Sequence, residues 1–137
     1  MAEENKSWND DMEITRRWME DLDKRLETEN QRQNLAAFRA VLNAVREQLS
    51  PEDSHKLSTE LPMTMSFEGW APAAGIDKAE NKDEFFERVK WNMTGCPRVE
   101  PEKAVKEVFD IIEKKIKAGE IKDENNAVMN VMESFAP

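Results

Sequence analysis

Large apolar side chains recur along this chain at spacings of three and four residues, which is the period of an α-helix with one buried face. One run predicts a helix over roughly residues 9 to 28, with Ser7 or Asn9 as its N-cap. A second run predicts a central helix that reaches Leu49. A chain built from such runs is constrained to pack helices together. The first run is Met12, Thr15, Trp18, Met19, Leu22 and Leu26, and the second is Leu35, Phe38, Leu42, Val45 and Leu49.

Composition also favours helices over strands. The 137 residues include four glycines and no tyrosine, and 39% of them are hydrophobic and 36% charged. The abundant Glu, Lys, Leu, Met and Ala residues lose little side-chain freedom in a helix. The length suits one domain. We therefore expect a single all-α domain over residues 1 to 137.

The chain resembles itself at a shift of 67 residues, since 85 − 18 = 67 relates Trp18 to Phe85. The same shift, without a gap, holds in a second segment beyond a polar loop. Two segments in register favour a duplicated unit over a chance match in helical phase. The pairs are Trp18 and Phe85, Met19 and Phe86, Leu22 and Val89, Leu26 and Met93, Ala37 and Ala104, Phe38 and Val105, Val41 and Val108, Leu42 and Phe109, Val45 and Ile112, and Leu49 and Ile116.

Helix start and stop signals divide each repeat into three helices. We expect a pseudo-symmetric bundle of two such repeats that share one core, with repeat one over about 8–61, a connector over about 62–82 and repeat two over about 83–137. The start signals are Ser50 with Pro51, Asp83, Pro101 and Asp123, and the stop signals are Pro62, the run TGCP and Gly119.

The connector LPMTMSFEGWAPAAG, at positions 61–75, is apolar but contains prolines and glycines that forbid one long helix. A half of about 60 residues is marginally stable alone, so we expect the halves to pack together and the connector to seal the seam. The same side chains are candidates for binding a partner, together with two tryptophans outside the main stripes. The candidates are Met63, Met65, Phe67, Trp70, Trp8 and Trp91.

Two interpretations of these residues stay open. Core filling is the simpler one for the methionines, including Met129 and Met132 of the last predicted helix. Because Met repacks at low cost, they also suit an adaptable groove for a partner helix. Trp91 lies between the apolar positions Val89 and Met93, so its ring is expected to be partly exposed.

Four runs of the sequence resemble the bacterial family called domain of unknown function 2267. They are AVREQLSPEDSHKLSTELP, FEGWAP, EFFERV and IKAGEIKDENNAV. The resemblance covers roughly residues 14 to 137 and departs at the end, where VMESFAP lacks a second Leu-Pro pair. It implies a small all-helical cytoplasmic protein and brings no catalytic residue. The matching positions are Arg46, Leu49, Ser50, Pro51, Leu61, Pro62, Phe67, Gly69 and Trp70.

No arrangement of residues marks a reaction, a metal or a cofactor. A Cys96 and His55 dyad would need both side chains within hydrogen-bond reach, and we expect them in different repeats. One Cys and one His do not make a zinc site. The acidic turns lack the Gly and Glu of a calcium-binding loop. We expect a non-enzymatic interaction or scaffold module that binds a protein or itself, and the alternative is a small enzyme using carboxylates or Cys and His.

Charge and hydropathy exclude other classes of partner. The net charge of −9 disfavours nucleic acid, and the lysine-rich run EKKIKAGEIK is interrupted by glutamates. No stretch approaches the roughly 18 apolar residues that span a membrane. The single Cys96 suits a reducing compartment. We therefore expect a cytoplasmic protein that binds neither nucleic acid nor membrane.

Replacing Trp70 with Ala tests the role of the connector. If the ring is buried in the seam, we expect the free energy of unfolding to fall by about 3 to 5 kcal/mol in chemical denaturation. A change near zero would instead identify an exposed recognition residue.

Overall fold

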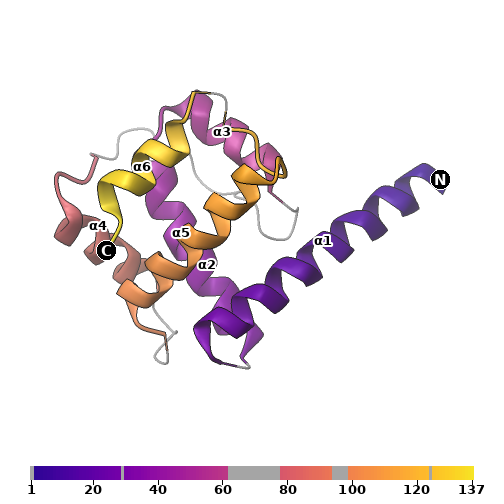
Figure 1. The fold of residues 1–137 in the computed structure, drawn as a ribbon, viewed down its shortest axis with the longest axis horizontal. Coiled ribbons are helices and arrows are strands. Elements are labelled where there is room, and N and C mark those ends of the chain that lie inside the picture. Colours follow the sequence, from indigo (N-terminus) through magenta and orange to yellow (C-terminus); the bar gives the residue numbers. More distant parts are fainter. Residues whose placement is uncertain (1, 29, 62–77, 94–98, 124) are drawn as a thin grey trace.

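The computed structural model describes residues 2–28, 30–61, 78–93, 99–123 and 125–137, and for residues 2–11 it describes the backbone alone. These residues form six α-helices and no strand (Figure 1). The helices are α1 (Ala2–Leu26), α2 (Gln31–Glu47), α3 (Pro51–Glu60), α4 (Lys82–Asn92), α5 (Pro101–Lys117) and α6 (Ala127–Phe135).

The helices α2 and α5 form the centre of the bundle. They contact each other, and both α1 and α4 pack against each of them (Figure 1). The short helix α3 packs on α2, and α6 contacts α2 and α4. The expected all-α helical bundle is confirmed. The symmetry between its two halves stays a prediction.

The local signals place several helix ends as expected. The Ser50 hydroxyl accepts a hydrogen bond from the Asp53 N–H at 3.1 Å, and Pro51 opens α3. Pro101 opens α5 in the same way. Beyond α5, Gly119 takes the left-handed conformation with φ of 78°, which a residue without a side chain adopts at low cost.

Two predicted helix starts are wrong. The first helix begins at Ala2 rather than near residue 9, so Ser7 and Asn9 lie inside it and do not cap it. The polar residues before the stripe are compatible with helix, so the start of the stripe does not mark the start of the helix. The helix α4 is capped by Asn81, whose side chain accepts from the Glu84 N–H at 2.9 Å, so Asp83 lies in its first turn.

Asp123 supports the start of α6 but is not its N-cap as predicted, because the helix begins only at Ala127 and the N-cap is Asn126. The two carboxylate oxygens of Asp123 accept the N–H groups of Val128 and Met129, each at 3.0 Å. Asn126, with φ of 55°, carries the chain into the helix. One side chain thus satisfies two of the N–H groups that a helix start leaves without intrahelical partners.

Buried side chains from all six helices form one core. Trp18 of α1 packs edge to face with Phe38 of α2, with 6.4 Å between ring centroids. Phe85 of α4 stacks on Phe135 of α6 at 4.6 Å. Every one of the ten residue pairs at the shift of 67 has at least one buried member, and eight have two. The expected seal by Met63, Met65, Phe67 and Trp70 lies outside the described residues.

The first half of α1 projects from the bundle as an arm (Figure 1). Among the described side chains of this helix, Ile14 and Trp18 are the first to pack on the core. Met12 is 45% exposed. We call residues 2–13 the α1 arm.

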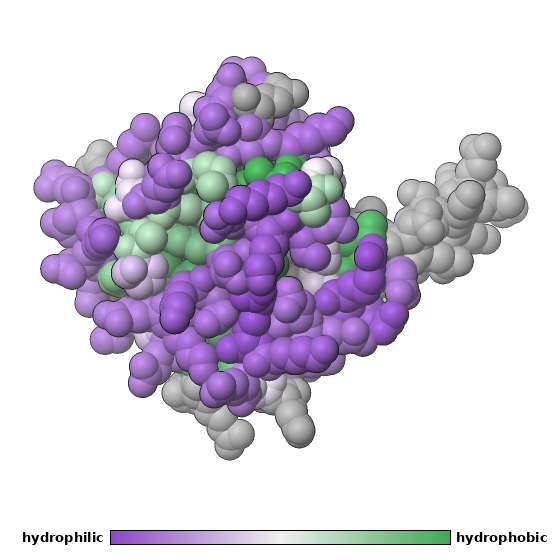
Figure 2. All heavy atoms as spheres, viewed as in Figure 1, coloured by the Kyte–Doolittle hydropathy of each residue, from purple (hydrophilic) through white to green (hydrophobic). Residues whose placement is uncertain are grey.

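Hydrophilic residues cover most of the face in Figure 2, and a pale green apolar area lies over α6. Among the residues of α6, Ala127, Met129 and Phe135 are half-buried and pack on the core. None of the described helices combines the length and the apolar content that crossing a membrane requires.

Two tryptophans give a matched stability test of this fold. Trp18 is 2% exposed and Trp91 is 78% exposed. We expect Trp18→Ala to lower the free energy of unfolding by about 3 to 5 kcal/mol, because it removes core contacts and leaves a cavity. Trp91→Ala should change it by no more than about 0.5 kcal/mol. Urea denaturation of both variants checks this, and equal losses would contradict the assigned burial.

Candidate functional site

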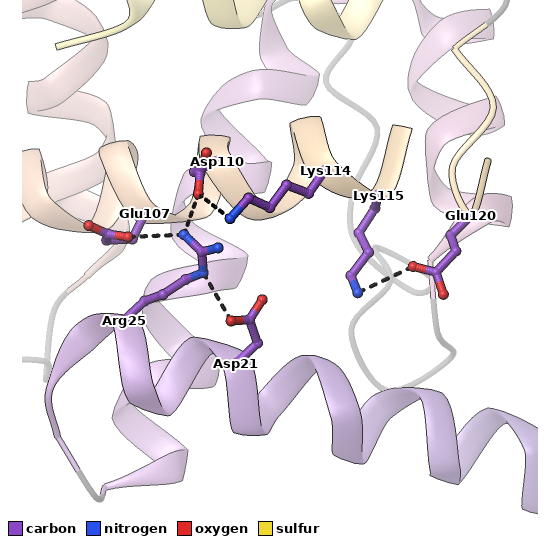
Figure 3. A network of polar contacts seen from close by, with 7 residues as sticks. All are labelled: Asp21, Arg25, Glu107, Asp110, Lys114, Lys115 and Glu120. Atoms are coloured by element: carbon purple, nitrogen blue, oxygen red, sulfur yellow. Dashed lines mark hydrogen bonds and ion pairs between the residues drawn. The ribbon is translucent and has the colours of Figure 1, made fainter. Parts of the chain in front are cut away.

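An ionic cluster joins α1 to α5 around Arg25 (Figure 3). The Arg25 guanidinium binds Asp21 of its own helix at 3.1 Å and reaches across to Glu107 at 3.3 Å and to Asp110. Lys114 binds Asp110 from the other side at 3.3 Å. The hydrogen bond from Arg25 lowers the pKa of the Asp110 carboxyl from its ordinary value, against a smaller opposing effect of burial.

A second polar cluster joins α2 to α4. Glu47, whose side chain is 10% exposed, binds Arg88 at 3.4 Å, and Arg88 also binds Glu84 at 3.1 Å. Asn43 accepts a hydrogen bond from the Arg46 Nε at 2.8 Å. Burial raises the pKa of the Glu47 carboxyl from its ordinary value, although the charge of Arg88 opposes the shift. Burial also lowers the pKa of the Arg46 guanidinium.

These two clusters connect helices rather than surround a substrate. A carboxylate with a raised pKa is a functional-site candidate when it lies in a cleft. Glu47 instead faces the neighbouring helix and is neutralised by Arg88, whose second partner is Glu84. A general acid or base must reach a substrate atom, so this arrangement favours a structural role for Glu47.

A shallow hollow lies between α3 and the start of α6. Its volume is about 120 Å³, and Lys56, Glu60 and Lys122 are among its lining residues. Lys56 binds Glu52 at 3.6 Å, and the Asp123 carboxylate in the wall is occupied by capping α6. Ligand pockets usually measure about 300 to 1,000 Å³. The hollow is therefore too small to enclose more than a few water molecules or an ion.

The Cys and His pair of the enzyme alternative is only half described. His55 is an exposed residue of α3, and Cys96 lies outside the described residues. Within the described part of the chain, no three His, Cys, Asp or Glu side chains are grouped so as to hold a metal ion.

The structure describes the side chain of one predicted partner-binding residue, Trp91, and not those of the others. Trp91 lies on the solvent side of α4 and is 78% exposed, whereas Phe85 and Val89 of the same helix are fully buried. Trp8 belongs to the α1 arm, but its side chain is outside the described part of the structure. The candidates Met63, Met65, Phe67 and Trp70 lie outside the described residues.

Sequence reasoning missed the exposure of Met12 and the two polar clusters. Met12 has the helical spacing of a core residue, and only the path of α1 past the bundle leaves it in solvent. Glu47 follows the apolar stripe of α2 in sequence, yet its burial depends on where α4 packs. The signal in the sequence was the presence of opposite charges, Glu47 and Arg88, on two predicted helices that could pack together.

Comparison with known families agrees with this architecture. A family model described as an uncharacterized conserved protein, DUF2267, matches residues 15–128. The chain belongs to the DUF2267 family. No curated protein matches it. The DUF2267 match begins beside Ile14, where α1 enters the bundle, so the α1 arm precedes the part that the family shares.

Substitutions in the two clusters should change the free energy of unfolding with opposite dependence on pH. The pKa of Asp110 is lowered in the folded state, so its charge stabilises the fold above the ordinary Asp pKa of about 4, and this contribution is lost as pH falls through the lower folded pKa. We expect Asp110→Asn to cost at most about 1 kcal/mol at pH 7, since the pair is partly exposed. The loss should disappear in acid.

The pKa of Glu47 is raised in the folded state, so the sign is reversed. Its contribution is fully present below the ordinary Glu pKa and is lost as pH rises through the higher folded pKa. The stability of Glu47→Gln relative to the natural chain should therefore increase from acid to neutral pH. Urea denaturation from pH 3 to 8 measures both slopes, and slopes of the same sign would contradict the assignment.

Proposed function

We propose that this DUF2267 protein is a non-enzymatic protein-interaction module of the cytoplasm that uses the solvent side of α4. The observation that carries the proposal is the 78% exposure of Trp91. Tryptophan is enriched among the residues that dominate binding energy in protein interfaces. A ring that the core does not need is therefore the best candidate for a contact residue.

The surroundings of Trp91 support this role. Glu87, Lys90 and Asn92 lie within about one helical turn of it and are exposed. An apolar centre with a polar rim is the usual anatomy of an interface that also exists free in water. The buried side of α4 is already complete, so binding at the solvent side requires no change in the bundle.

No observation favours the enzyme alternative to the same degree. The carboxylate whose pKa burial raises, Glu47, is held in an ion pair between helices. The hollow beside α3 has a smaller volume than substrate pockets have. A cytoplasmic location is supported by the single cysteine, because disulfides are rare there.

Quantitative affinity capture from cell extract tests the proposal with the full chain immobilised. We expect Trp91→Ala to lower the recovery of specific partners about tenfold or more, because it removes the apolar anchor. Lys24→Ala, an exposed lysine of α1 outside the proposed surface, is the control and should retain them. Trp91→Phe should restore part of the recovery.

Equal recovery with all three variants would contradict a role for Trp91. In parallel, the purified protein is incubated with a metabolite extract. Specific turnover that survives Trp91→Ala would support the enzyme alternative instead.

A further inference from the structure

We draw no further inference here: the strongest candidate, the half-buried apolar surface of α6 around Met129 and Phe135 (Figure 2), carries nothing beyond its packing on the core, because nothing in the described part of the structure shows what covers it.

Discussion

The contact between α2 and α5 is the constraint on which the other contacts depend. Both helices bury side chains around much of their circumference, and each buried Val, Leu or Ile contributes about 1.5 to 3 kcal/mol before entropy. Helices of this kind need cover on more than one side. The helices α1 and α4 provide this cover, because each packs against both α2 and α5. The helix α3 packs on α2, and α6 packs on α2 and α4. The six-helix bundle is therefore the consequence of two central helices that are too apolar to face water.

The polar clusters act at the edges of that core. Asp110 and Lys114 of one cluster lie 67 positions after Asn43 and Glu47 of the other, and Arg88 lies 67 positions after Asp21. The two clusters pair different side chains at positions 67 apart. In one, the hydrogen bond from Arg25 lowers the pKa of the Asp110 carboxyl, and in the other, burial raises the pKa of the Glu47 carboxyl. The predicted repeat matches apolar positions, which fill the core, and does not match the members of the ion pairs.

Local chemistry made part of this structure predictable. The stripe of α2, the Ser50 cap with Pro51, and the stop at Gly119 depend on neighbouring residues alone. Trp91 was expected to be exposed because it falls off the stripe of α4. The start of α1 at Ala2 was not predictable from the stripe, since a helix can continue beyond the part that is buried. The low exposure of the Glu47 side chain depends on where α4 packs and on the pair with Arg88, which the sequence of α2 alone does not show.

Burial distinguishes the large apolar residues of the core from those of the candidate surface. Trp18 and Phe85 are accounted for by their burial, and no further role is needed to explain them. Trp91 and Met12 are large apolar side chains in solvent, one on the back of a helix whose buried side is complete and the other on an arm outside the shared bundle. Trp91 is therefore the exposed apolar residue on which the proposed interaction surface rests.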